Sequence, residues 1–286
     1  MFTLLFFQPA GSPAIALEDL TDGLAAIPGL ALDGRTGAAY RPGTWSDAAT
    51  GARCILDLGT PPLEEDSMHP PRSYAGWMPV PLVVSIPLAG PHWFCVEALR
   101  VAEAVMTRFP EVSALDTEDI IADESAEPGP FAWDRLRAIA SWERQRAARC
   151  DALGNVPRMH RRSSVAMWRY RRERRLGRER HPGSLWPDAM VLSDVSDRSA
   201  LSAAFFRDST KPIAIPPVDL LIVARGGEPG GRPAAEVRAA AGGGIPAGFA
   251  QASLVQPSAG LDAYLAQASP LPTSAFSALG DEDWTD

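Results

Sequence analysis

The order of apolar segments in residues 1–116 constrains the fold of this chain more than any other feature. An apolar run at 2–7 predicts a strand, and the segment 12–29 that follows has leucines at helical spacing. Ser12 is placed to cap that helix. The later elements predicted here are three strands, a helix and a final strand, at 30–32, 53–58, 80–88, 92–109 and 112–115.

Strand, helix, strands, helix and strand is the order of a split βαβ unit. We therefore expect an α+β protein whose N-terminal half, residues 1–116, is ferredoxin-like, with its helices on one face of a mainly antiparallel sheet. Residues 117–130 are acidic and end in Pro-Gly-Pro, which predicts a linker or loop.

Beyond this linker we expect a helix, an arginine-rich segment and strands over 131–225, packed on the first half. The spacing of Trp133, Leu136 and Ala140 places these residues on the buried side of the helix. The tail at 226–286 is rich in Gly, Ala, Pro and Ser, and we expect short helices there. The apolar runs that predict a β-rich C-terminal half lie at 189–194, 199–208 and 218–225.

Composition favours a cytoplasmic protein that folds on its own, with 46% hydrophobic residues available for a core. The apolar N-terminal run is too short for a membrane helix and lacks the features of a signal peptide, so we expect no membrane contact. Cys54, Cys95 and Cys150 are far apart and form no CxxC pair, which argues against a disulfide scaffold or a cysteine zinc site. We expect no cofactor.

Charge is distributed very unevenly. Between Asp134 and Pro182 there are 15 arginines and five acidic residues, a net charge of +10, so the rest of the chain carries −18 within a total of −8. The densest part is residues 158–181, "RMHRRSSVAMWRYRRERRLGRERH". This segment is the main candidate for a binding surface.

Three interpretations of the arginine-rich segment stay open. It forms a strand whose aromatic residues face the core while its arginines pair with acidic loops at 64–66 or 118–127 or with the tail; it binds a protein partner with a charged face; or it binds nucleic acid through phosphate contacts and base stacking. An overall pI near 5.1 makes nucleic acid the less favoured partner. The candidate partner-binding residues are Arg161, Arg162, Trp168, Arg169, Tyr170, Arg171, Arg172, Arg174 and Arg175.

The histidines form no HxH or HExxH motif, so no metal site is predicted. His92 begins a predicted helix that also carries Cys95, and a thiol near a helix N-terminus with a nearby imidazole is the arrangement of a nucleophilic pair. The alternative is that Cys95, in register with Leu99 and Ala102, is a buried small residue of the core. His69, His160 and His181 are interpreted as solvated side chains.

Two further motifs resemble functional sites less closely. Four glycines after the strand at 218–225 suggest a phosphate-binding turn, but they do not make GxGxxG and Glu228 would oppose a phosphate, so a loop is favoured. Four aspartates near predicted strand ends offer possible cation ligands or acid–base groups, although aspartate is common in turns. The residues concerned are Gly226, Gly227, Gly230 and Gly231, and Asp194, Asp197, Asp208 and Asp219.

The stretches "VSIPLAGPHWFCVEALRVAEAV", "MWRYRRERR" and "IAIPPVDLLIVAR" together resemble a bacterial family of uncharacterised α+β proteins. The resemblance spans most of residues 1–225 and implies no activity. Our prediction is a non-enzymatic, cytoplasmic protein-binding factor, such as an immunity protein or an accessory protein of a secretion system. The alternatives are a nucleic-acid-binding protein that uses residues 158–181 and a hydrolase with the Cys95 and His92 pair.

Overall fold

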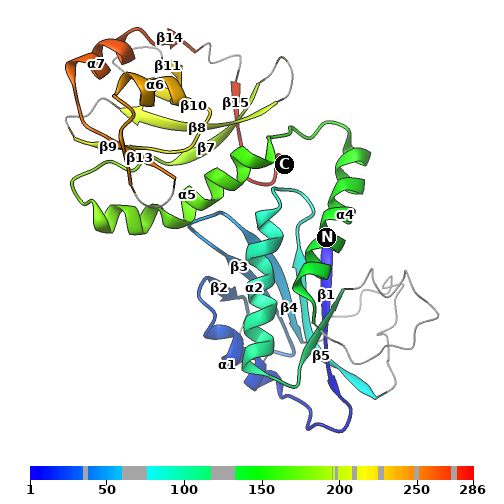
Figure 1. The fold of residues 1–286 in the computed structure, drawn as a ribbon. Helices are drawn as coiled ribbons and strands as arrows, with labels where there is room; N and C mark the ends of the chain where they lie inside the picture. The colour runs from blue at the N-terminus through cyan, green and yellow to red at the C-terminus, as the bar shows by residue number, and fades with distance from the viewer. Residues whose placement is uncertain are drawn as a thin grey trace. The chain divides into compact units, whose positions relative to one another are not determined.

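The chain divides into two compact units, each with its own sheet and helices. A computed structural model describes residues 1–34, 38–59, 76–116, 133–194, 196, 199–207, 211–224, 229–247, 251–271 and 276–286. The first unit comprises residues 1–88 and 92–152, and the second comprises 89–91 and 153–286 (Figure 1). The fold class is α+β, with mainly antiparallel sheets. Among the described residues, no helix is long and apolar enough to cross a membrane.

The first unit is built on a six-stranded sheet in the order β2-β3-β4-β5-β1-β6, in which every neighbouring pair is antiparallel. Alternate residues of β5 are buried from Val80 to Ile86, as expected for a strand with one face on the core. In β1, Phe2 and Leu4 follow this pattern, but Phe6, Phe7 and Gln8 are buried consecutively after a register shift between Leu5 and Phe6. The strands are β1 (Phe2–Pro9), β2 (Leu30–Leu32), β3 (Tyr40–Ser46), β4 (Arg53–Gly59), β5 (Trp77–Ile86) and β6 (Ser113–Asp116).

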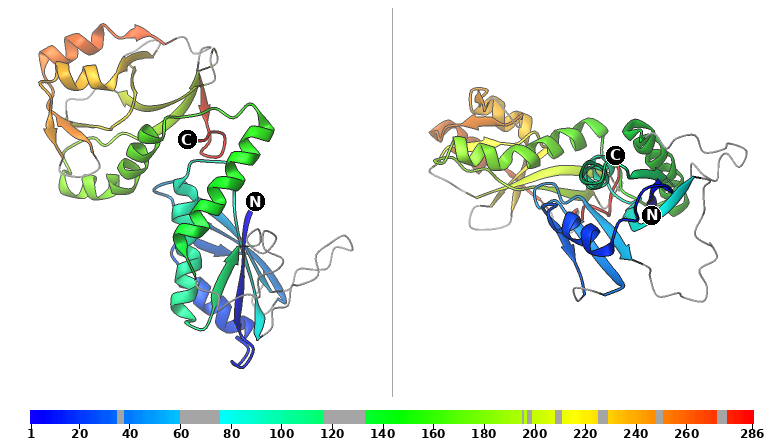
Figure 2. Two further views of the ribbon diagram at one scale, coloured as in Figure 1. Left: turned by 45° about the vertical axis from the view of Figure 1, so that its right-hand side comes forward. Right: turned by 90° about the horizontal axis from the view of Figure 1, so that it is seen from below.

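Two helices of the first unit, α1 (Leu17–Ala25) and α2 (Trp93–Arg108), contact each other and both contact β4 (Figure 2). The predicted buried face of α2 is confirmed for Cys95, Leu99 and Ala102, which are all fully buried. A third helix, α4 (Arg135–Leu153), begins beside α2, where Arg135 donates to the carbonyl of Val96 over 2.7 Å.

The predicted start of the first helix is wrong. Ser12 is not its cap, since α1 begins at Leu17 and its N-cap residue makes no side-chain capping bond. The buried Gln8 side chain of β1 explains the difference: its Nε2 donates to the Pro13 carbonyl over 2.7 Å, and its Oε1 accepts from the Ile15 amide over 3.4 Å. These bonds hold the intervening chain in a non-helical conformation.

The predicted buried face of the third helix is also wrong. Leu136 is 76% exposed, Ala140 is exposed and Trp133 lies before the helix. The buried face instead includes Ser141, which donates to the Asp116 carboxylate, and Trp142, which donates to the Pro87 carbonyl over 3.0 Å. Polar partners on neighbouring elements, rather than apolar spacing alone, decide which side of α4 faces inward.

The second unit contains a six-stranded sheet in the order β14-β11-β10-β8-β7-β15 and a smaller sheet in the order β12-β13-β9. Only the pairing of β8 with β10 is parallel among the pairs described. The three apolar runs predicted as strands are confirmed as β7, β8 and β10. The strands are β7 (Ala189–Asp194), β8 (Ala200–Arg207), β9 (Ile213–Ile215), β10 (Leu220–Ala224), β11 (Gly230–Pro233), β12 (Ile245–Pro246), β13 (Ser253–Val255), β14 (Ser269–Pro270) and β15 (Phe276–Leu279).

The arginine-rich segment is the helix α5 (Arg161–Arg180), so the interpretation as a strand is wrong. Arginine, alanine, methionine and leucine favour helices, and their summed propensity prevails here over the apparent apolar alternation. The helix contacts β7 and β8. The short helices α6 (Ala234–Ala240) and α7 (Ala259–Ala266) contact each other.

The glycine-rich tail is part of the second unit's core rather than an appendage. Its strands pair with earlier ones, as β11 does with β10 and β15 does with β7. Trp284 is fully buried, and the amide of Met159 donates to the carbonyl of Thr285 over 2.8 Å. Residues 226–286 therefore complete the unit that begins at residue 153.

Candidate partner-binding surface on α5

The helix α5 carries nine arginines and two glutamates, a net formal charge of +7 within twenty residues. Helical periodicity separates these arginines into two rows. One row lies beside the buried residues Ser164, Met167, Tyr170 and Gly177; in it Arg171 and Arg174 are partly buried and Arg178 is exposed. The other row faces solvent. We call them the inward and the outward row.

Arg171, in the inward row, is 13% exposed and holds the C-terminal segment. Its guanidinium donates to both carboxylate oxygens of Asp281, over 2.8 and 2.9 Å, and to the carbonyl of Ala189 over 3.0 Å. A charge-assisted contact of this kind is stronger than a hydrogen bond between neutral groups. This arginine therefore joins α5, β7 and the tail, and it is a structural residue.

Arg174 and Arg178 extend the inward row. Arg174 forms an ion pair with Asp188, and Arg178 donates to the carbonyl of Trp186 over 3.2 Å. Burial, and after it the neighbouring Arg178 guanidinium, lowers the pKa of Arg174 below its ordinary value. The inward arginines thus bind the segment that connects α5 to β7.

Tyr170 is buried and belongs to the same connection. Its hydroxyl donates to the carbonyl of Pro187 over 2.7 Å, and its ring stacks on Trp186 with 6.3 Å between centroids. Burial raises the pKa of Tyr170, so the phenol stays protonated and keeps its donor role. Of the predicted binding residues, Tyr170, Arg171 and Arg174 have these internal partners.

The outward row consists of exposed arginines at both ends and along the middle of the helix, Arg161, Arg162, Arg169, Arg172, Arg175 and Arg180. Apolar surface lies between them: Leu176 is 39% exposed, and the Arg172 guanidinium lies 5.3 Å from the centroid of the Trp168 ring. Sequence analysis missed Leu176, Arg178 and Arg180. Placing the segment on a helical wheel would have grouped Leu176 and Arg180 with the outward arginines.

The two histidines of the segment stand at the ends of α5. His160 is the N-cap, and its Nδ1 accepts from the amide of Arg162 over 3.1 Å. His181 follows the last turn and stacks near Trp186 with 6.3 Å between centroids. Both residues help to set the helix boundaries. His69 lies outside the described residues.

The second candidate, His92 with Cys95, lies in the first unit at the start of α2. His92 is the buried N-cap residue and makes no side-chain capping bond. Cys95 is fully buried, and burial raises the pKa of its thiol. A raised pKa keeps the thiol protonated at neutral pH, whereas a nucleophilic cysteine needs the thiolate. This environment suits a core residue.

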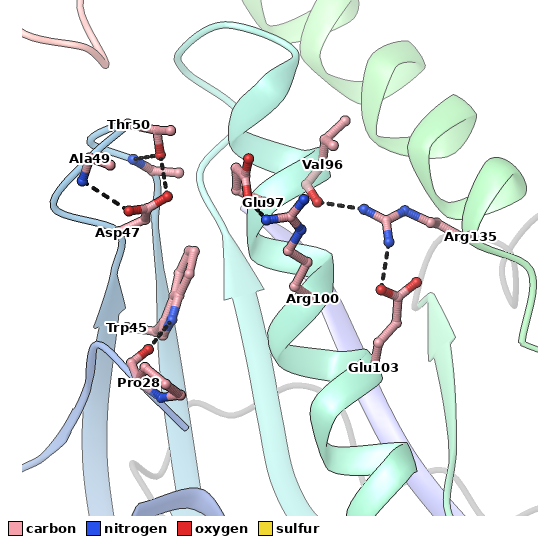
Figure 3. A network of polar contacts seen from close by, with 11 residues as sticks. Pro28, Trp45, Asp47, Ala49, Thr50, Val96, Glu97, Arg100, Glu103 and Arg135 are labelled. Carbon is pink, nitrogen blue, oxygen red and sulfur yellow. Dashed lines mark hydrogen bonds and ion pairs between the residues drawn. The ribbon is translucent and has the colours of Figure 1, made fainter. Parts of the chain in front are cut away.

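Polar side chains nevertheless gather along α2 (Figure 3). Glu97, although 1% exposed, pairs with Arg100 over 2.7 Å. Six residues further along α2, Glu103 pairs with Arg135 over 2.5 Å, and Arg135 also donates to the carbonyl of Val96. The contacts of Arg135 hold the start of α4 against α2. Arg100, Glu103 and Arg135 were not predicted as site residues from the sequence.

The aspartates and glycines considered as sites have structural roles where they are described. Asp219 accepts from the amide and the hydroxyl of Ser202 over 3.0 and 2.6 Å, and Asp194 accepts from Ser196 within a turn. Gly230 and Gly231 lie in β11, where a Cβ would come within 2.8 Å of Ala268 and Leu271. The remaining predicted residues, Asp197, Asp208, Gly226, Gly227 and Glu228, lie outside the described residues.

Within the described ranges, no group of three or more His, Cys, Asp or Glu side chains is arranged to hold a metal ion. In the comparisons with known proteins, no family model, no curated protein and no solved structure matches the chain. The two arginine rows of α5 and the surfaces near them are therefore the features that bear on function.

Proposed function

We propose that this protein is a non-enzymatic binding factor that recognises an acidic face of another protein through the outward row of α5. The observation that carries the proposal is the division of the helix. Its inward arginines have internal acceptors, such as Asp281 for Arg171, whereas six outward arginines are exposed. The exposed guanidinium groups of the outward row, including Arg175, which pairs with Glu179 of the same helix over 3.7 Å, are positioned to contact a partner.

The composition of the outward row favours a protein over nucleic acid. Arginine and tryptophan are the residue types that contribute most at protein interfaces, and Leu176 adds exposed apolar area between charges. Phosphate contacts would gain nothing from that leucine. The net charge of −8 also opposes approach of a polyanion to most of the chain.

A second surface of the same unit supports a protein partner. Apolar side chains gather on one face of the larger sheet, around Leu192, Ala203 and Ile222. The residues packed against them are only partly buried, and they are Met190, Phe205, Leu220, Leu271 and Phe276. Partly exposed apolar area of this kind is characteristic of protein interfaces.

Two finer assignments are part of this proposal. The first is that the N-terminal unit is ferredoxin-like. If β1, β4, β5 and β6 are numbered one to four in chain order, their order across the sheet is four, one, three, two, which is the order of a split βαβ sheet. In that interpretation β2 and β3 extend the β4 edge. The second is a cytoplasmic role as an immunity or secretion-accessory protein, which remains a prediction from the sequence.

The test compares two charge-reversal variants of the full chain. In one, Arg162, Arg169 and Arg172 are replaced by Glu on α5; in the matched control, three exposed arginines of α4 are replaced by Glu, namely Arg137, Arg144 and Arg149. Proteins of the native cell are captured with wild type and both variants, and the partner is identified by mass spectrometry and its affinity remeasured with purified protein.

We expect the α5 variant to lose a stoichiometric partner that wild type and the α4 variant both retain, with unchanged circular dichroism. Equal binding by all three proteins would contradict the proposal. So would micromolar binding of a DNA or RNA oligonucleotide whose log K falls by about 0.7–0.9 per phosphate contact for each tenfold rise in salt.

A further inference from the structure

We propose that the first unit contains a binding site for a small organic cation of the alkylammonium or quaternary ammonium class. The site is a cavity of about 450 Å³ that is widely open to solvent, where α2 ends and β6 begins. This volume lies within the range of small-molecule sites, roughly 300–1,000 Å³. The inference goes beyond the proposed function, which concerns the second unit.

Two indole rings line the cavity. Trp77 is the first residue of β5, and Trp133 precedes α4, so two separate parts of the chain bring indole side chains to one place. Met106 and Val112 complete an apolar wall. Indole faces carry negative electrostatic potential and attract ammonium groups, and apolar walls suit the methyl or methylene groups around the nitrogen.

Two carboxylates, those of Glu103 and Glu111, line the same cavity. Arg135 pairs with Glu103, so that carboxylate is already compensated. Glu111 is exposed, and in the described part of the chain it has no basic partner within ion-pair distance. Among the described residues at this place, the two carboxylates and Arg135 leave one negative charge, which matches a ligand with one positive charge.

The end of α2 adds to this potential. Met106 and Thr107 lie in the last turn of the helix, where unpaired carbonyls give a partial negative charge. The nearest basic residue of that turn, Arg108, has its side-chain stem towards α1, as a Cβ placed on Gly23 would lie 3.4 Å from its Cγ. Two indole side chains, two carboxylates and the last turn of α2 thus line the same space.

The test is calorimetric titration of the full chain with choline chloride and with its uncharged isostere 3,3-dimethyl-1-butanol, at constant ionic strength. We expect choline to bind at least about tenfold more tightly, the ratio that one desolvated contact with an indole face provides. Trp77→Leu and Glu111→Gln should each weaken choline binding by about tenfold. Glu111 is exposed, so its variant should remain folded.

Glu18→Gln, an equivalent change at an exposed position of α1, is the matched control and should leave choline affinity unchanged. The proposal would be overturned by equal affinity for choline and the alcohol, by no binding of choline, or by the same loss in the Glu18 and Glu111 variants. Each of these results is independent of the partner-binding role of α5.

Discussion

Gly177 and Trp186 lie in direct contact, with the indole ring against the backbone of α5. A Cβ on Gly177 would come within 2.5 Å of the ring atom Cη2 of Trp186, which is closer than atoms approach without a shift. The ring also stacks with Tyr170 and with His181, with 6.3 Å between centroids in each pair. The absence of a side chain at position 177 therefore lets the helix and the segment before β7 close together.

Gly177→Ala should destabilise the protein even though alanine favours helices by about 1 kcal/mol over glycine. The clash with Trp186 should exceed that gain and lower the free energy of unfolding by about 1–3 kcal/mol. Urea denaturation measures the change. The control is Gly183→Ala, where a Cβ meets nothing within 4 Å, and it should stay within about 0.5 kcal/mol of wild type.

Arg171→Met should show that the inward row of α5 stabilises the fold whereas the outward row does not. It removes the two-oxygen contact with Asp281 and the bond to Ala189, and we expect a loss of about 1–2 kcal/mol of unfolding free energy, because both partners are only partly solvated. Arg169→Met changes the outward row and should have little effect on stability. Similar losses for both variants, measured in urea, would refute the division into rows.

Above pH 9.0, the ordinary pKa of a cysteine thiol, Cys54 should make the free energy of unfolding depend on pH, because burial raises the pKa of this thiol to about 12. Below pH 9.0 the thiol is protonated in both the folded and the unfolded chain, so its full contribution to stability is present. Between 9.0 and about 12 the unfolded chain loses the proton first, so stability falls by up to about 1.4 kcal/mol per pH unit.

The measurement is urea unfolding of wild type and Cys54→Ala at about pH 8 and about pH 10.5. The variant should lose about 2 kcal/mol less than wild type over this interval. Cys95, which is also buried with a raised pKa, contributes equally to both proteins and cancels in the difference. Identical pH slopes would show that Cys54 does not titrate in this way.

Gln8→Leu should release the chain that precedes α1. Without the bonds to Pro13 and Ile15, backbone polar groups lose their partners, and we expect about 1–2 kcal/mol lower stability. Hydrogen exchange at the Ile15 amide should become faster. Thr3→Val, another polar-to-apolar change on β1, should leave that exchange unchanged, and a matching acceleration there would argue against a specific role for Gln8.

The elements that sequence reasoning located correctly are those whose signal is local. The apolar runs that became β1, β7, β8 and β10 and the regular face of α2 around Cys95 need only neighbouring residues to be recognised. The strand β3 was missed because Pro42 and Gly43 within it are typical of turns. It is a strand because it pairs along its length with β4.

The sequence by itself determined where charge accumulates, since nine arginines in α5 are visible without any structure. Only the tertiary structure decided which of them bind partners inside the fold. Asp281 lies 110 residues from Arg171 in the chain, and the buried stripe of α5 includes Ser164 and Gly177, which carry no apolar signal. Their burial depends on Trp186 and the C-terminal segment, and contacts between such distant residues leave no periodic trace in the sequence.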